Sequence, residues 1–292
     1  MNNNKQHLLI TGANGQLGRE LTAAFATDHR YEVLCTDVAE LDITSPEAVE
    51  QYFNTHAIDY VVNCAAFTAV DLAESEHELC RKLNVDAVGL LAQAAASHGA
   101  KMVHISTDYV FDGNACRPYS EDDPTHPVSA YGSTKLAGEQ LMMERCPDGI
   151  VIRTAWLYSP HGKNFVKTML RLGAERDRLS VVFDQVGSPT SATDLAGAIR
   201  HIITGGEWHP GIYHYSNEGA ISWFDFTIAI HAIAGLHCQV TPCLSEDYPT
   251  PAHRPHYSVL DKSKIKRTFH LSIPYWRDSL ELCIHHLQSP TA

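Results

Sequence analysis

The sequence predicts an α/β fold, a Rossmann-type doubly wound parallel sheet followed by a smaller C-terminal part. Short apolar runs alternate with longer amphipathic runs through the first half of the chain, which is typical of βαβ units. A glycine-rich turn follows the first apolar run, and the regular alternation loosens after Trp156. We therefore expect one part from residues 1–155, completed by parts of 178–216, and a second part from residues 156–292.

The apolar runs of the first part predict parallel strands, because strands covered on both faces of a sheet are apolar throughout. The runs between them carry apolar residues at helical spacing, as Leu17, Leu21 and Phe25 do. Gly99 is expected to end the longest helix as its C′ glycine. The predicted strands are 7–11, 31–36, 60–65, 101–106 and 150–154, and the predicted helices are 16–25, 45–52, 76–98 and 130–145.

The second part has a weaker pattern. We expect Thr193 or Asp194 to cap one of its helices, and the prolines of 248–255 to hold an extended, ordered loop. His285 and His286 should lie on the solvated face of the last helix. The predicted helices are 164–173, 193–203, 223–233 and 276–287, the last burying Leu280, Cys283, Ile284 and Leu287, and the predicted strands are 180–183 and 212–216.

Composition excludes several classes of protein. The 292 residues are 44% hydrophobic and 19% charged, which is typical of a chain with a substantial core. A net charge of −12 disfavours nucleic-acid binding, which uses a basic face. No apolar run is long enough to span a bilayer, and residues 1–5 lack the layout of a signal peptide. The eight scattered cysteines form no C-x-x-C pair, so we expect reduced thiols, no metal site and a cytoplasmic protein.

The glycine-rich turn predicts a dinucleotide site. Gly12, Gly15 and Gly18 form G-x-x-G-x-x-G between the first strand and the first helix. The first glycine permits a tight turn, the second lets the backbone approach a pyrophosphate, and the third lets the helix pack on the strand. The free N–H groups of the helix N-terminus then bind the anion. A purely structural glycine turn is the alternative interpretation.

Asp37 follows the second predicted strand, roughly 20 residues beyond the glycine turn, where an acid can accept hydrogen bonds from an adenosine ribose. Its charge would repel a 2′-phosphate unless a cation compensates, and Arg19 is the candidate cation. NADH is therefore expected to be tolerated, and the choice between NADPH and NADH stays open. A polar residue that merely ends a strand is the alternative. Asp42 and Ile43 are further candidates for the adenine edge.

The predicted helix 130–145 carries the catalytic pattern. Tyr131 and Lys135 stand at i and i+4 and share one helix face. An ammonium beside a phenol stabilises the phenolate, so the tyrosine becomes a usable acid or base. Thr107 ends the fourth predicted strand, where a doubly wound sheet opens onto its ligand crevice. We expect Thr107 to hydrogen-bond the substrate oxygen that Tyr131 protonates.

These motifs resemble those of the extended short-chain dehydrogenases. The shared elements are the glycine loop, Asn63-Cys64-Ala65-Ala66 and the Y-x-x-x-K pair. Further segments are similar to the dTDP-4-dehydrorhamnose reductase family, and the resemblance covers nearly the whole chain. Those segments are 68–71, 105–113, 153–158, 164–165, 185–190 and 254–261.

The resemblance implies NAD(P)H-dependent reduction of the C4 ketone of dTDP-4-dehydro-L-rhamnose to dTDP-L-rhamnose, for cell-surface polysaccharide synthesis. Tyr131 would donate the proton, Lys135 would hold the nicotinamide ribose and tune Tyr131, and Thr107 would orient the ketone. Cofactor contacts are expected from Gly12, Asn14, Gly15, Gln16, Leu17, Gly18, Asp37, Asp42, Ile43, Ala65, Ala66, Tyr131 and Lys135. Substrate contacts are expected from Val70, Thr107, Asp108, Trp156, Asn164 and Arg254.

Alternatives stay open for two of these residues. Trp156 offers an apolar face and one N–H donor to a deoxysugar, but it could instead be an ordinary packing residue. Arg254 has the fork geometry that suits a diphosphate, but it could instead form a surface salt bridge.

Two other functions compete with the reductase. One is a sugar-nucleotide epimerase or dehydratase of the same fold; a dehydratase would favour an Asp-Glu pair after the active-site threonine, whereas Tyr109 follows Asp108 here. The other is a non-catalytic, reductase-like regulatory subunit, which the intact Thr107, Tyr131 and Lys135 set disfavours. Some family members are associated with Mg²⁺ and dimer contacts through acids in the segment that is 191–194 here. Only Asp194 is acidic there, which disfavours Mg²⁺ and leaves a homodimer open.

Overall fold

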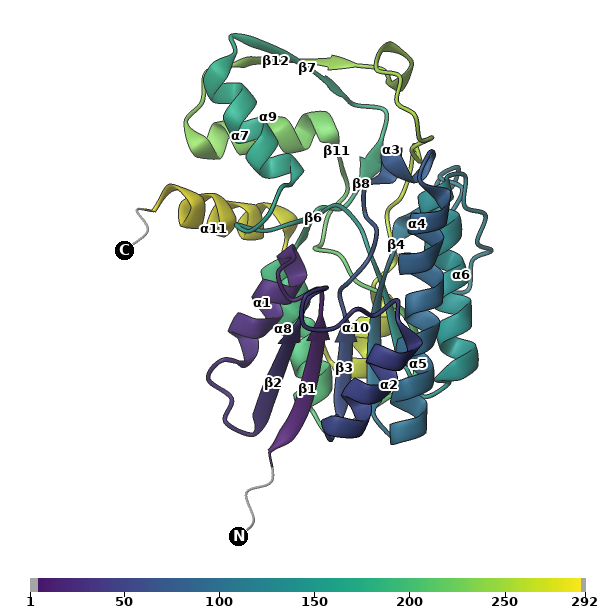
Figure 1. Ribbon diagram of the computed structural model, residues 1–292. Coiled ribbons are helices and arrows are strands. Elements are labelled where there is room, and N and C mark those ends of the chain that lie inside the picture. The colour runs from purple at the N-terminus through teal and green to yellow at the C-terminus, as the bar shows by residue number, and fades with distance from the viewer. Residues whose placement is uncertain (1–4, 290–292) are drawn as a thin grey trace.

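The computed structural model describes residues 5–289 and confirms the α/β class. Six parallel strands form one sheet in the order β10 (Gly211–His214), β5 (Ile150–Thr154), β4 (Lys101–Thr107), β3 (Tyr60–Asn63), β1 (Gln6–Thr11) and β2 (Tyr31–Thr36). Figure 1 shows β2, β1 and β3 side by side. β2 pairs with one side of β1, and β3, the next strand in the chain, pairs with the other side. This reversal of strand order places the switch point of the sheet between β1 and β3, at their carboxyl ends.

The second part is built from shorter elements than the sheet part. The elements of the sheet part agree closely with the sequence prediction. Its strands and the helices packed on it are β1 (Gln6–Thr11), α1 (Gln16–Phe25), β2 (Tyr31–Thr36), α2 (Pro46–Thr55), β3 (Tyr60–Asn63), α3 (Val70–Ala73), α4 (His77–Arg81), η1 (Lys82–Asp86), α5 (Ala87–His98), β4 (Lys101–Thr107), η2 (Asp108–Val110), α6 (Ala130–Arg145), β5 (Ile150–Thr154), α8 (Ala192–Thr204), β10 (Gly211–His214) and α10 (Ser263–Phe269). The remaining elements are β6 (Leu157–Tyr158), α7 (Phe165–Glu175), β7 (Arg178–Val182), β8 (Val186–Gly187), β9 (Thr190–Ser191), β11 (Ile221–Ser222), α9 (Trp223–Ala234), β12 (Gln239–Cys243), η3 (Ser245–Asp247) and α11 (Trp276–Gln288).

Helices cover both faces of the sheet. Leu8 and Ile10 pack under α1 and α8, while Leu9 between them packs under α2, α5 and α6, because successive strand residues point to opposite faces. All three side chains are fully buried, as expected for a central parallel strand. α8 and β10 follow the start of the second part in sequence, yet α8 packs on α1 and β10 extends the sheet beside β5.

A separate core holds the second part above the carboxyl edge of the sheet (Figure 1). α7, α9 and α11 contribute its apolar side chains together with the pair of strands β7 and β12. α9 begins with a capping box between Ser222 and Asp225 and ends at Gly235, whose φ is +68°. The last helix buries Leu280, Cys283 and Ile284 as predicted and leaves its two histidines exposed, whereas Leu287, also predicted to be buried, is only partly buried.

The structure corrects the prediction of one uniform helix over 76–98. The helix contains a π turn, η1, between α4 and α5, and it ends as predicted at Gly99 with φ +72°. The wider π turn carries Asn84, whose side chain accepts from Phe67 N at 2.8 Å and donates to Phe67 O at 3.1 Å. This pair of hydrogen bonds ties the loop after β3 to the helix.

The predicted cap of α8 is wrong. Ser191 is the N-cap, and Thr193 and Asp194 lie within the first turn. The Asp194 carboxylate accepts instead from Asn217 Nδ2 at 2.6 Å and Ser279 Oγ at 2.5 Å. The prediction also missed α3, α10 and β12, because the first two span few residues and β12 is an edge strand that contains Pro242.

A buried ion pair joins α6 to β5. The Arg153 guanidinium donates to Glu139 at 3.0 Å through Nε and at 2.7 Å through Nη2, and both side chains are nearly inaccessible to solvent. Arg153 also lies over the Phe111 ring, 5.2 Å from its centroid. The bidentate geometry compensates two desolvated charges and fixes the helix that carries Tyr131.

We expect Glu139→Gln to destabilise the protein by about 3–5 kcal/mol, because the buried Arg153 charge would lose its partner. Urea denaturation measures this loss. Glu175→Gln is the matched control: it removes the exposed i,i+4 pair with Arg171, and we expect less than about 0.5 kcal/mol. Similar losses in both variants would contradict the role given to the buried pair.

Candidate active site

A cleft of about 790 Å³ opens at the carboxyl edge of the sheet, beneath the second part. Its walls come from the loop after β1, the ends of β2, β3 and β4, the start of α6, and residues of segments 154–157 and 162–164. The cleft brings together most residues singled out by sequence, but Asn14 and Arg254 do not line it. The predicted residues that do are Gly12, Gly15, Gln16, Leu17, Gly18, Asp37, Asp42, Ile43, Ala65, Ala66, Val70, Thr107, Asp108, Tyr131, Lys135, Trp156 and Asn164.

The glycine loop has the geometry of an anion cradle. Gly12 has φ +64°, and a Cβ there would lie 2.8 Å from Ala65 N. A Cβ on Gly18 would collide with the Gly12 carbonyl and with Ala13. No side chain caps α1 at Gly15, so the first N–H groups of the helix face the cleft unpaired by a cap. The residues present therefore fit the pyrophosphate of a dinucleotide.

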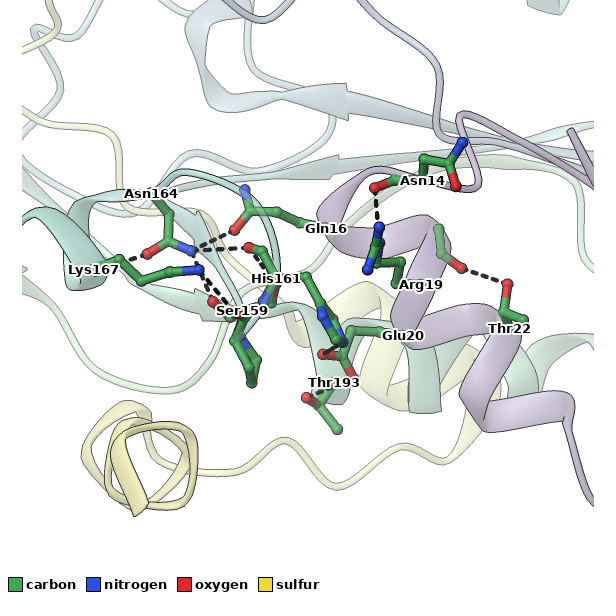
Figure 2. Close-up of polar contacts among 12 residues, drawn as sticks. Asn14, Gln16, Arg19, Glu20, Thr22, Ser159, His161, Asn164, Lys167 and Thr193 are labelled. Atoms are coloured by element: carbon green, nitrogen blue, oxygen red, sulfur yellow. Dashed lines mark hydrogen bonds and ion pairs between the residues drawn. The ribbon is translucent and has the colours of Figure 1, made fainter. Parts of the chain in front are cut away.

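Two charged side chains, Asp37 and Arg19, contact the glycine loop at Asn14. Asp37 accepts a hydrogen bond from Asn14 N at 3.3 Å and one from Val38 N at 2.9 Å. On the other side of Asn14, Arg19 Nε donates to the Asn14 carbonyl at 3.1 Å (Figure 2). An acid suited to ribose hydroxyls and a cation suited to a phosphate thus both contact the backbone of Asn14.

Tyr131 and Thr107 meet at the floor of the cleft. Ser129 caps α6 by accepting from Gly132 N, which holds Tyr131 in the first turn of the helix. The Tyr109 ring packs edge-on against the Tyr131 ring, with centroids 5.5 Å apart. Burial raises the pKa of Tyr131 well above its ordinary value, while a hydrogen bond with Thr107 acts in the opposite direction. The phenol is therefore protonated at neutral pH, as a proton donor must be.

Lys135 is buried below Tyr131. Its Nζ donates to the Ile105 carbonyl at 2.6 Å and lies 3.4 Å from His104 Nε2. Burial lowers the pKa of Lys135 to about 8. The amine thus contacts β4.

Asp108 is a buried acid in the cleft wall. Thr107 Oγ1 donates to its Oδ1 at 3.0 Å, while its Oδ2 is buried and finds no hydrogen-bond partner within residues 5–289. Burial raises the pKa of Asp108 to about 6, although the hydrogen bond from Thr107 acts against this. A buried acceptor with a free lone pair is suited to a ligand hydroxyl group.

Trp156 lies in the part of the cleft wall formed by residues 154–157. Its backbone conformation is strained, with φ 49°. Its indole stacks on Trp223 with ring centroids 3.4 Å apart and planes 7° apart. A Cβ on Gly187 would lie 2.6 Å from the indole. The second part therefore shapes a slot for this ring beside the cleft.

Asn164 bridges the two parts of the molecule. Its Oδ1 accepts from Lys167 N and so caps α7, while its Nδ2 donates to Gln16 Oε1 and to Ser159 O, both at 2.8 Å (Figure 2). A second contact between the parts lies nearby, where Glu20 Oε1 of α1 is 3.7 Å from His161 Nε2. The glycine helix is thus tied directly to the segment that closes the cleft.

Arg254 forms the salt bridge that the sequence left as an alternative. Its guanidinium makes two hydrogen bonds to Asp71, at 3.0 and 2.9 Å. The Asp71 pKa is held below its usual value chiefly by these hydrogen bonds. The pair connects α3 to the loop before residue 255.

The comparisons with known proteins agree with this arrangement. A family model described as the RmlD substrate binding domain matches residues 6–289. A dTDP-4-dehydrorhamnose reductase of Aggregatibacter actinomycetemcomitans is 43% identical over 284 residues, covering 94% of this chain and 97% of the relative. The chain belongs to the dTDP-4-dehydrorhamnose reductase family.

Solved structures of dTDP-4-dehydrorhamnose reductases share the fold. The protein from Clostridium acetobutylicum is 45% identical with a TM-score of 0.94, and the match covers 97% of this chain and 100% of that one. The protein from Bacillus anthracis, solved in complex with NADP, is 39% identical with a TM-score of 0.93 and the same coverage.

Sequence reasoning overlooked several residues of this dTDP-4-dehydrorhamnose reductase family member. Tyr109 and Lys163 line the cleft, and Trp223 supports Trp156. Tyr109 and Lys163 adjoin predicted site residues, which was the available signal, whereas the Trp223 contact spans distant segments. Across residues 5–289, no cluster of three or more histidine, cysteine or acidic side chains is placed to hold a metal ion. No helix in the same range is long and apolar enough to cross a membrane.

We expect Asp108→Asn to stabilise the protein near pH 7.5 more than near pH 4. The folded-state pKa is raised from 3.8 to about 6, so ionisation costs stability as pH rises through this window. At about 1.36 kcal/mol per pKa unit, the difference between the two pH values should be roughly 1–3 kcal/mol. Denaturation at both pH values measures it.

Asp123→Asn is the control of opposite sign. Its hydrogen bonds with Arg117 lower the Asp123 pKa to about 2, so its removal should destabilise the protein at neutral pH. An Asp108→Asn effect that is the same at both pH values would contradict the burial argument.

Proposed function

We propose that this protein reduces the C4 ketone of dTDP-4-dehydro-L-rhamnose to dTDP-L-rhamnose with NADPH or NADH, in dTDP-rhamnose synthesis for surface polysaccharides. The observation that carries the proposal is the meeting of Thr107, Tyr131 and Lys135 in the cleft that the glycine loop opens. The near full-length similarity to proteins named for this reaction supports it. The free-thiol state of all eight cysteines supports a cytoplasmic site of action.

The reduced nicotinamide, when bound, supplies the hydride. Tyr131 holds a proton on its phenolic oxygen and gives it to the ketone oxygen as negative charge develops there. Thr107 orients that oxygen by a hydrogen bond. Lys135 holds the nicotinamide ribose and, as an ammonium, favours the phenolate that Tyr131 becomes.

Residues of both parts position the sugar nucleotide. We assign Val70, Asp108, Trp156 and Asn164 to the sugar-binding wall, with the Asp108 carboxylate as acceptor for a sugar hydroxyl. Binding energy from the nucleotide and diphosphate would hold the ketone in place for reduction. Arg254 lies outside the cleft lining and is held by Asp71, so a diphosphate contact by Arg254 would require this pair to separate.

The competing functions lack a supporting observation of this kind. A dehydratase would favour acid–base groups beyond the Tyr–Lys pair, and Tyr109 occupies the position next to Asp108. A purely regulatory subunit would not need the half-buried, protonated Tyr131 beside Thr107 in an open cleft.

The decisive experiment is reduction of a thymidine-diphosphate-linked 4-keto-6-deoxyhexose by the purified protein, followed by cofactor absorbance and product analysis. We expect Tyr131→Phe to lower kcat by about 10²–10⁴-fold with cofactor affinity nearly unchanged, because only the proton donor is lost. Tyr158→Phe is the control, since this buried phenol has no hydrogen-bond partner in the described chain and does not line the cleft.

Other outcomes would support one of the competing functions or reject the role of Tyr131. Turnover of a sugar nucleotide without net cofactor consumption would establish the epimerase function. Tight cofactor binding with an inert ketosugar would establish the regulatory function. Near-normal turnover in Tyr131→Phe would remove the tyrosine from the mechanism.

The choice of cofactor follows from the charges around Asn14. We expect Asp37→Asn to weaken NADH binding about tenfold by loss of charged hydrogen bonds worth about 1.5–3 kcal/mol, and to leave NADPH binding unchanged or stronger, because repulsion of the 2′-phosphate is relieved. Arg19→Met should weaken NADPH binding and spare NADH, because its charge offsets a 2′-phosphate. Dissociation constants for both cofactors measure the two effects; parallel losses for both cofactors in both variants would contradict the assignment.

A further inference from the structure

Three buried polar side chains form a row across the sheet below the cleft. Thr11 of β1 pairs in register with Asn63 of β3, which pairs with His104 of β4. All three side chains lie on the face covered by α2, α5 and α6, and each is at most 1% exposed. Lys135, on α6, completes the row at its His104 end, 3.4 Å from Nε2.

Only one orientation of the Asn63 side-chain amide satisfies the hydrogen bonds of its neighbours. Ala65 N–H can only donate, and it lies 3.1 Å from Asn63 Oδ1. Thr11 Oγ1 donates to the same oxygen at 2.7 Å. The other amide atom, Nδ2, must therefore donate, and it lies 3.1 Å from His104 Nδ1.

This orientation decides the histidine tautomer. Because His104 Nδ1 accepts a hydrogen bond, the single proton of the neutral ring is on Nε2. The ring is neutral because complete burial, together with the neighbouring Lys135, lowers the His104 pKa well below its ordinary value. The Nε2–H group then points at Lys135 Nζ.

We propose that His104 is a positioning residue, held by Asn63 as the Nε2–H tautomer, and that it controls where the Lys135 side chain and its proton reside. A neutral amine accepts the Nε2–H hydrogen bond while it donates to Ile105 O. An ammonium has no lone pair to accept with, so it must turn its protons elsewhere, toward the cleft and the cofactor ribose. The row thereby links the base of the glycine loop to the catalytic lysine.

Other titratable side chains besides His104 surround Lys135. Glu139 lies on the same helix, but its carboxylate is engaged by Arg153. Cys80 faces Lys135 from α4, and Cys64 faces it from the loop after β3. Burial raises the Cys64 pKa far above neutrality, so that thiol is uncharged.

The tautomer is directly measurable in the unmodified protein without any substrate. A long-range ¹H–¹⁵N correlation spectrum of histidine-labelled protein distinguishes the protonated ring nitrogen from the bare one. We expect His104 as a neutral Nε2–H tautomer from pH 6 to pH 9. An Nδ1–H tautomer or an imidazolium at neutral pH would overturn the proposal, whether or not the protein reduces a sugar nucleotide.

The effect on Lys135 is measured by the pH dependence of NADPH binding. Because burial places the Lys135 pKa at about 8, affinity should fall as pH rises through this value. His104→Asn keeps an acceptor for Asn63 but removes the Nε2–H group, so the neutral amine loses its hydrogen bond. The fall should move to higher pH by about 0.5–1 unit, the size expected for one net hydrogen bond.

His231→Asn is the matched control, since His231 is also buried but bonds to Met169 O in the second part. Its pH dependence should be that of the unmodified protein. An unshifted pH dependence in a folded His104→Asn variant would overturn the proposal, and if that variant fails to fold, the tautomer spectrum decides alone. The role for turnover rests on the proposed function, but both measurements use cofactor or free protein, so a failure of the reductase assay leaves this test intact.

Discussion

The parallel, in-register pairing of β1, β3, β4 and β5 is the constraint on which the rest of the molecule depends. Parallel strands present all their carboxyl ends at one edge, so the glycine loop, the Asn63 segment and Thr107 converge there although they are distant in sequence. The same register aligns polar residues in one row beneath that edge. The helices on each face then bury the strands.

Burial sets the chemistry of this floor. It lowers the pKa of Lys135 and raises that of Asp108, because a low-dielectric surrounding disfavours the charged form of each. Both groups are thereby brought toward the neutral range in which proton transfer is useful. The Glu139–Arg153 pair is equally buried but fully compensated, so it acts as a rigid support for the helix that carries the tyrosine.

The second part completes the site by long-range contacts. Asn164 joins the glycine helix to α7, and the Asp71–Arg254 pair joins α3 to a distant loop. Trp156 lines the cleft with its backbone at a positive φ. Its indole is held by Trp223, which stacks on one face, and by the space that Gly187 leaves beside it. These contacts explain how a small, irregular layer holds side chains over a regular sheet.

The sequence by itself determined the sheet part and most of the cleft. Strand and helix periodicity, the glycine spacing and the Tyr131–Lys135 pair are local patterns, and local patterns survive without knowledge of distant neighbours. Only the tertiary structure decided which partner each polar group takes. Arg254 pairs with Asp71, Asp194 bonds Asn217 instead of capping its helix, and Lys135 contacts Ile105 and His104. The physical reason is that a hydrogen bond or ion pair depends on angstrom-scale distances between segments far apart in the chain, and those distances exist only once the sheet, its helices and the second part have packed together.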